Sequence, residues 1–425
     1  MDSVIKSAIS TTKRCLVEED ALPCSEGVTY HLIPSLEEAR RILGPGSDAL
    51  RRSRSIVYFR GMQDKSRTKL RIGMHDRGEE YVWADGTIHE EDVDGHRHHL
   101  PLHLKLIQYE SLHIPAGTTL DFSHRHTEWD NISQREELYV LVRIKKLTVE
   151  AGAAIEVHGN VFVLQVQEIQ MLPQVVDVST FDIRILPVPY FSYSRYRRGS
   201  SIDGLPGANG RHSVHSQAAE CVGTLFGPGM IGDEINPDGV PGENGEPGQA
   251  GTNGMNGGMC MLADLGFHHI EGFPPKTLRI FSQAGKGQAG GNGGRGGHGG
   301  NGGNGAPGFA HGINKSMRGL GGHGGKGGEG GNGGRGGNGG LASNIFITLP
   351  EQSAECLNLC AVDSLGGKSG SGGPGGVGGD GGHHGSWIDA GNIVETAPRG
   401  VDGCAGQAGS TGKCRPAPQM YVFHL

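Results

Sequence analysis

Apolar positions recur at helical spacing in the first 50 residues and at strand spacing after them. Ser35-Leu-Glu-Glu38 before an apolar run is a capping box, and it predicts a helix that ends at Leu43 before Gly44-Pro45. Upstream, residues 4–16 keep the same helical period. From Ser55 the pattern alternates in short runs, which predict strands at 56–59, 70–72 and 80–83. We therefore expect an N-terminal helical segment over 1–50 and a β domain over 51–200.

A repeat lies inside the predicted β domain. Residues 111–122 align without gaps to residues 146–157, with aliphatic positions matched around an Ala-Gly corner at Gly117 and Gly152. Each unit is a strand, a corner and a second strand, as in one coil of a β-solenoid, and residues 161–169 are a candidate third unit. The expected fold class is mainly β, with short N-terminal helices, a β-solenoid-like or β-sandwich middle and a glycine-rich extended-helix bundle.

The bundle is predicted from glycine periodicity in the C-terminal half, over residues 201–425. The chain has 77 glycines among its 425 residues, and they recur every third position. In the three central runs a second glycine follows the first, so an extended helix with three residues per turn presents two bare rows to its neighbours. Short alternating strands separate the runs. The runs are 287–308, 321–339 and 367–385, flanked by 239–257 and 400–412.

Collagen and a flexible linker are the two alternatives for these runs. A collagen triple helix needs proline at roughly 15–20%, whereas the central runs hold only Pro307 and Pro374. A glycine-rich linker is flexible, and the strict three-residue phase argues against it. A polyglycine-II bundle needs several runs side by side, because buried backbone N–H and C=O groups require partners.

The third, non-glycine row of each run is mostly polar. Its side chains would stand roughly every 9–10 Å along a rod, a spacing that suits recognition of a repetitive ligand such as a glycan, or of another rod. We therefore expect a structural or adhesive binding protein that self-associates or binds a protein or glycan. The candidate binding residues are Arg295, His298, Asn301, His323, Asn332 and Arg335, with Trp387 in a loop that follows the third central run.

At the level of architecture, residues 204–412 resemble the glycine-rich helix bundles of the Obg GTPase N-terminal domain, the anaplastic lymphoma kinase extracellular region and some phage tail adhesins. The resemblance implies a scaffold or recognition surface that performs no chemistry. An Obg-like GTPase is excluded for this chain, because Leu320 and Gln407 occupy the positions where the phosphate-binding motif before Lys326 and Lys413 requires its first glycine.

A possible divalent metal site defines the alternative function, a metal-dependent enzyme. The first repeat unit carries an insertion after Phe122, in which His124 and His126 share one face of an alternating segment and Glu128 follows at the same period. With His158 from the second unit, these side chains offer the imidazole and carboxylate ligands that zinc or iron accepts. The segment also resembles the first cupin motif, although the spacing of its glutamate differs. A solvated histidine-rich face is the plainer interpretation, since the chain has 21 histidines.

Charge and targeting signals narrow the expectations further. The formal net charge is −7, so we do not expect nucleic acid as a partner, although Arg295-Gly-Gly and Arg335-Gly-Gly resemble RGG elements. The N-terminus lacks the apolar stretch of a signal peptide and no run is long enough to span a membrane, so we expect a protein that is cytoplasmic or released without a signal peptide. We then expect its eight cysteines to be free thiols. If the protein is exported by another route, Cys404 and Cys414 are the best candidate disulfide.

Overall fold

The computed structural model describes residues 15–16, 27–44, 82–83, 100–129, 132, 137–172, 180–187, 207–211, 220–224, 227–231, 238–307, 310–311, 314–315, 318–386 and 395–425. Its strands are β1 (Cys15–Leu16), β2 (Gly27–Ile33), β3 (Leu102–Ile114), β4 (Thr119–Asp121), β5 (Leu138–Val149), β6 (Ala154–His158), β7 (Val161–Met171), β8 (Phe181–Leu186), β9 (Glu220–Thr224), β10 (Gly227–Ile231), β11 (Ala263–Glu271), β12 (Leu278–Gln283), β13 (Ala310–His311), β14 (Asn314–Lys315), β15 (Ile345–Leu349), β16 (Leu357–Val362) and β17 (Met420–His424). Its helices are α2 (Leu36–Leu43) and the 3-10 turns η1 (His126–Glu128) and η4 (Glu351–Cys356).

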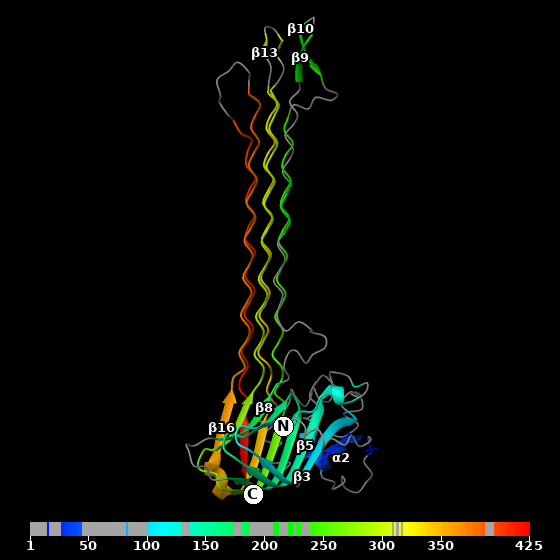
Figure 1. The fold of residues 1–425 in the computed structure, drawn as a ribbon, viewed down its shortest axis with the longest axis vertical. Coiled ribbons are helices and arrows are strands. Elements are labelled where there is room, and N and C mark those ends of the chain that lie inside the picture. The colour runs from blue at the N-terminus through cyan, green and yellow to red at the C-terminus, as the bar shows by residue number, and fades with distance from the viewer. Residues whose placement is uncertain are drawn as a thin grey trace, which may run out of the picture.

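Two parallel-rich sheets form the body of the molecule (Figure 1). The first sheet has the order β1-β2-β3-β5-β7-β11-β15-β17, and the second has the order β16-β12-β8-β6-β4. From β3 onward, successive strands of these two sheets belong alternately to the first and the second. Among the described strands of the two sheets, only β2 and β3 pair antiparallel. The chain therefore builds both sheets together, one strand of each at a time.

The sequence repeat fixes the register of this alternation. Ser111 pairs with Lys146 in the first sheet, and Thr119 pairs with Ala154 in the second, which is the gapless alignment of the two units. The corner between the strands falls at Gly117 and Gly152, whose φ angles of 70° and 81° lie in the left-handed region that favours glycine. Matched apolar residues are thus stacked directly beside one another.

Apolar side chains cover both faces of the first sheet. A core that includes Ile155, Phe181 and Ile280 fills the space between the two sheets. On the other face, α2 and Trp83 pack over Tyr139 and Phe346. The predicted helix is confirmed: Ser35 is its N-cap, and the Ser35 hydroxyl accepts a hydrogen bond of 3.2 Å from the backbone N–H of Glu38.

A long stalk of glycine-rich segments rises from the sheets (Figure 1). We call its segments rods 1 to 6: residues 207–211, 239–257, 287–305, 321–339, 366–385 and 400–412 respectively. Successive rods run in opposite directions and bond directly, as in the hydrogen bond of 2.8 Å from Gly325 N–H to Gly300 C=O between rods 4 and 3. Rods that run in the same direction are bonded too, since Gly290 of rod 3 donates to the carbonyl of Lys368 in rod 5.

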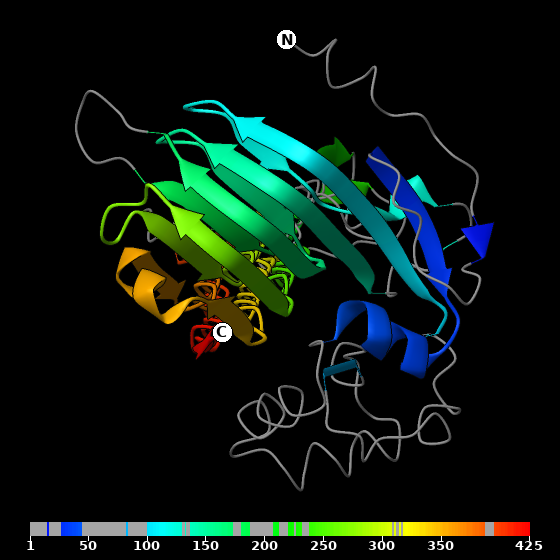
Figure 2. The same ribbon diagram turned by 90° about the horizontal axis from the view of Figure 1, so that it is seen from below.

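The stalk continues the two sheets. Rods 2, 4 and 6 lead into β11, β15 and β17 of the first sheet, whereas rods 3 and 5 leave β12 and β16 of the second. Ala263 pairs with Ile345 in the sheet, and the contact between Asn244 and Lys326 in the stalk spans the same separation of 82 residues. Figure 2 is viewed along the length of the stalk, with the rods behind the sheets. One register therefore runs from the body through the stalk.

Close packing explains which rods need two glycine rows. A Cβ at Gly297 would lie 1.9 Å from the carbonyl oxygen of Ala208 in rod 1, and one at Gly296 would lie 2.0 Å from that of Gly328 in rod 4. Rods 3, 4 and 5 contact an oppositely directed rod along their length on each side, and these are the three Gly-Gly-X runs. Rod 2 has such a neighbour along its length only in rod 3, because the described part of rod 1 reaches rod 2 only around residues 243–247. Rod 6 has rod 5 as its oppositely directed neighbour among the described rods, and a single glycine row serves it.

The expected fold class was wrong. With 7% helix, 35% strand and two parallel-rich sheets, the chain falls in the α/β class rather than forming a mainly β chain with a β-solenoid and a glycine-helix bundle. The strands pair into two open sheets, one with an antiparallel edge and a helix on its outer face. The glycine runs carry no helical assignment, because their hydrogen bonds link separate extended segments.

Two local expectations also change, and several lie outside the described residues. Val82 and Trp83 are helical where a strand was expected. Cys404 and Cys414 are both free and exposed. Ten residues along an extended rod cover roughly 31 Å, far beyond the roughly 4.4–6.8 Å between the Cα atoms of a disulfide. The predicted strands at 56–59 and 70–72 fall on residues that the structure does not describe. So does the predicted helix over 4–16, apart from Cys15 and Leu16, which form strand β1 instead.

Candidate functional site

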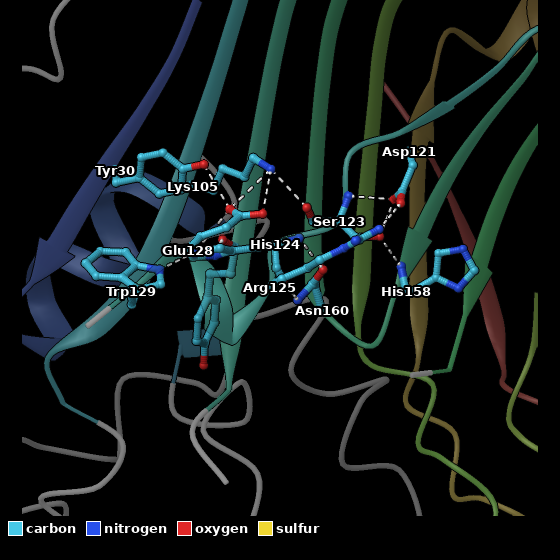
Figure 3. Close-up of polar contacts among 11 residues, drawn as sticks. Tyr30, Lys105, Asp121, Ser123, His124, Arg125, Glu128, Trp129, His158 and Asn160 are labelled. Carbon is cyan, nitrogen blue, oxygen red and sulfur yellow. Dashed lines mark hydrogen bonds and ion pairs between the residues drawn. The ribbon is translucent and has the colours of Figure 1, made fainter. Parts of the chain in front are cut away.

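The insertion that follows Phe122 forms a polar cluster against the first sheet (Figure 3). It runs from the end of β4 through η1 to Trp129 and packs on β2 and β3. Lys105 of β3 donates a hydrogen bond of 2.9 Å from Nζ to the carbonyl of Ser123. Asn160 clamps the backbone of His124 on both sides, since its Oδ1 accepts from His124 N–H at 2.8 Å and its Nδ2 donates to His124 C=O at 2.9 Å.

Both ring nitrogens of His124 have partners. Nδ1 lies 3.1 Å from the carbonyl oxygen of Tyr139, so it carries the hydrogen, and Nε2 accepts a hydrogen bond from the indole N–H of Trp129. Burial lowers the pKa of His124 to about 3, with the charge of Lys105 acting in the same direction. The imidazole is therefore neutral at pH 7, and its lone pair is directed at Trp129.

Glu128 is the acidic centre of the cluster. It accepts a hydrogen bond of 2.9 Å from the Tyr30 hydroxyl and forms an ion pair with Lys105 at 3.4 Å. Burial and the Glu128 charge raise the pKa of Tyr30. The His124 ring lies 4.0 Å from the same carboxylate. The Glu128 carboxylate thus pairs with both the Lys105 ammonium and the Tyr30 hydroxyl, and these contacts hold the insertion on the sheet.

The predicted metal ligands do not converge. His124 and Glu128 lie together, His126 is partly exposed in η1, and the ring of His158 on β6 lies 3.5 Å from Glu156 instead. Within the part of the chain that the structure describes, no three His, Cys, Asp or Glu side chains form a group able to hold a metal ion.

A serine beside an acid and a histidine also occurs in this cluster, without the geometry of a nucleophile. The Ser123 hydroxyl contacts the carboxylate of Asp121 and accepts a hydrogen bond of 2.9 Å from the backbone N–H of His158. In a serine–histidine pair the base is a ring nitrogen next to the hydroxyl, and here the main chain of His158 takes that place. Sequence reasoning missed Asp121, Tyr30, Lys105 and Asn160, because the first three come from strands β4, β2 and β3 and Asn160 lies in the turn between β6 and β7.

The stalk contains the predicted binding row, and part of that row is used internally. The Asn301 Oδ1 accepts from Asp380 N–H at 2.9 Å, and the Asn332 Oδ1 accepts from Gln407 N–H at 2.8 Å. His298 Nδ1 accepts from Val377 N–H at 3.0 Å. These three side chains therefore stitch each rod to the next rod that runs in the same direction.

The other predicted binding residues differ in exposure. Arg295, His323 and Arg335 are exposed on the rods, whereas Trp387 lies outside the described residues. The asparagine contacts recur along the stalk, always between a side-chain oxygen and the backbone N–H of a non-glycine residue in the next rod of the same direction. The other asparagines that make this contact are Asn209, Asn244, Asn253, Asn256, Asn292, Asn304 and Asn338.

Two short hairpins lie at the end of the stalk far from the sheets (Figure 1). One pairs β9 with β10 and the other pairs β13 with β14, both antiparallel. We call these hairpins the tip. Each one connects a rod that runs away from the sheets to a rod that returns, so the stalk fixes where both of them lie.

Comparisons with known proteins identify no relative: no family model matches the chain, and neither a curated protein nor a solved structure does. The resemblance to the Obg, anaplastic lymphoma kinase and phage tail families remains a prediction. No helix among the described residues is long and apolar enough to cross a membrane.

Proposed function

We propose that the protein is a structural or adhesive binding protein whose stalk holds the tip hairpins away from the body so that they meet a partner. The observation that carries the proposal is that the rods bond to one another along their backbones. Glycine N–H groups donate to neighbouring rods along rods 2, 3, 4 and 6 and in one glycine row of rod 5, and asparagine side chains accept from amides between the glycines. A stalk built in this way keeps its length without help from a ligand.

The length of the stalk supports the role of a spacer. Rod 2 has 19 residues by its bounds (257 − 239 + 1), which corresponds to roughly 59 Å at about 3.1 Å per residue. A chain that only needed a stable core gains nothing from this extension, because glycine loses the most conformational entropy on ordering. Holding the tip at a fixed distance from the body is a function that accounts for this loss of conformational entropy.

The exposed side chains on the flanks offer a second surface for the same binding function. Arg295 and Arg335 stand on different rods, and the acidic residues Glu243, Glu246 and Glu329 are also exposed on the rods. The stalk therefore exposes charges of both signs, and this favours solubility over recognition of a single charged polymer. We therefore propose that the tip binds the partner, and the flanks serve as the control surface in the experiment that follows.

The experiment is a binding screen of three proteins on one printed glycan array and on immobilised polysaccharides. The first is the full chain, the second has both tip hairpins replaced by Gly-Ser linkers of equal length, and the third carries Arg295→Ala and Arg335→Ala. The proposal predicts binding by the full chain and the arginine variant and loss in the tip variant. Binding retained without the tip would move recognition to the flanks, and no binding by any of the three would remove glycans as the ligand class.

A further inference from the structure

Strand β17 forms an open edge of the first sheet. It pairs with β15 in parallel, and Leu425 N–H donates to Leu349 C=O, so the odd-numbered residues direct their backbone groups toward β15. The N–H and C=O groups of Met420, Val422 and His424 then point away from the sheet. Among the described residues, none bonds to these outward groups. A row of open backbone groups is a template for another strand.

The strand lacks the usual protection of an edge. Its sequence, Met-Tyr-Val-Phe-His, contains no lysine, arginine, aspartate or glutamate, and no proline or bulge interrupts it. Natural sheets place lysine, proline or a bulge on such edges to prevent pairing. Pro416 and Pro418 precede the strand and leave its five residues free of that constraint.

Both hydrophobic clusters of the body reach this edge and stop there half covered. Met420 and Val422 pack against the core between the sheets, and Tyr421 and Phe423 pack against the cluster on the outer face. All four side chains have intermediate exposure. A strand that completes the edge must therefore carry apolar side chains on both of its faces.

We propose that this edge is a homodimer interface, at which β17 pairs antiparallel with β17 of a second copy about a two-fold axis. The same five residues supply the apolar alternation that each side requires, and an isologous interface is self-complementary in this way. With Val422 opposite the partner's Val422, Met420 faces the partner's His424, and the outward N–H and C=O groups of both strands find partners. Each cluster then continues into the equivalent cluster of the second copy.

The dimer has a defined shape. Rod 6 leads directly into β17, so the direction of the strand is the direction of the returning rod. Antiparallel pairing therefore sends the two stalks in opposite directions, with one tip at each end. A parallel pairing would set the stalks side by side, and it lacks the two-fold symmetry by which two copies of one strand complete each other.

The test is the mass of the full chain in solution, measured by size-exclusion chromatography with light scattering. The expected mass is twice the 44.7 kDa of one chain. Val422→Pro removes an outward N–H while keeping the bonds to β15, so it should give the monomer mass. Val422→Thr keeps the N–H at nearly the same size and should remain dimeric.

A second variant and a second measurement guard against a folding defect. His424→Pro removes another outward N–H at an exposed position and should also give monomer, with circular dichroism confirming the native fold of each variant. Electron microscopy of the wild type should show two stalks pointing in opposite directions. A monomeric wild type, a folded proline variant that stays dimeric, or two stalks side by side would overturn the proposal.

Discussion

The side chain of Asn301 accepts a hydrogen bond of 2.9 Å from the backbone N–H of Asp380, although the two residues are 79 positions apart. The paired strand residues Leu278 and Leu357 of the second sheet have the same separation. A register set in the packed body is thus carried into a stalk that has almost no apolar side chains of its own. Asparagine at the non-glycine position helps to hold this register, beside the glycine N–H bonds between the same rods.

Replacing Asn301 with alanine should weaken the stalk at one rung. The variant leaves the Asp380 amide without its acceptor, and we expect a loss of about 1 kcal/mol. Amide hydrogen exchange should show faster exchange at Asp380 with little change in the sheets. His323→Ala is the matched control, because the His323 side chain is exposed on a neighbouring rod. Equal exchange at Asp380 in both variants would mean that the asparagine contacts contribute nothing.

A single methyl group inside the stalk should be far more damaging. A Cβ at Gly328 would lie 2.0 Å from the carbonyl oxygen of Glu246, and backbone on both sides prevents relaxation. We expect Gly328→Ala to cost about 3 kcal/mol, measured as a drop in the thermal midpoint and as local loss of exchange protection. Glu329→Ala at the next, exposed position should be nearly neutral. A tolerated Gly328→Ala would show that the rods are not in close contact.

His124 should make the body sensitive to acid. Its pKa in the folded state is about 3, below the 6.5 of the free side chain, because burial disfavours the charged form. The unfolded chain therefore binds an extra proton between pH 6.5 and pH 3, and stability falls as the pH is lowered through this window, by about 1.4 kcal/mol per pH unit.

His124→Asn isolates this effect, because asparagine keeps a donor and does not titrate. Denaturant unfolding of both proteins at pH 7 and pH 4.5 should show a smaller loss on acidification in the variant. Identical losses would contradict the assignment of His124 as a buried neutral group. The carboxylates of the chain titrate in both proteins, so their contribution to the loss of stability cancels in the comparison.

Metal content tests the geometry of the insertion. Because the ring nitrogens of His124 have partners and His158 faces Glu156, we expect purified protein to carry no stoichiometric zinc, iron, copper or manganese. Mass spectrometry should give the same low metal content for the wild type and for a His124→Ala/His126→Ala variant. One equivalent of metal that is present in the wild type and lost in the variant would support the alternative function, a metal-dependent enzyme.

The sequence predicted local features well, because each had a local cause. The capping box at Ser35 and Glu38 predicted α2, and the gapless repeat predicted the pairing of Ser111 with Lys146. The glycine periodicity predicted extended segments side by side, although the glycine-helix bundle expected from it was wrong. The class of the fold was missed, since a strand–corner–strand repeat does not say that its strands form open sheets with a helix on one face.

The site was less predictable, for a physical reason. His124 and Glu128 share a short segment, and proximity along the chain suggested a shared ligand. The groups that decide their chemistry, Tyr30, Lys105 and Tyr139, come from three strands whose register depends on tertiary pairing. Likewise, the contact between Asn301 and the Asp380 amide depends on rod 5 lying beside rod 3, which the sequence does not specify.

Amide hydrogen exchange along residues 287–305 measures whether the stalk is an ordered structure within one chain. We expect slow exchange for both glycine rows of this segment, because their N–H groups donate to rods 2 and 5. Exchange at the rate of an unstructured peptide throughout the segment would contradict it, and the stalk would then be a flexible linker.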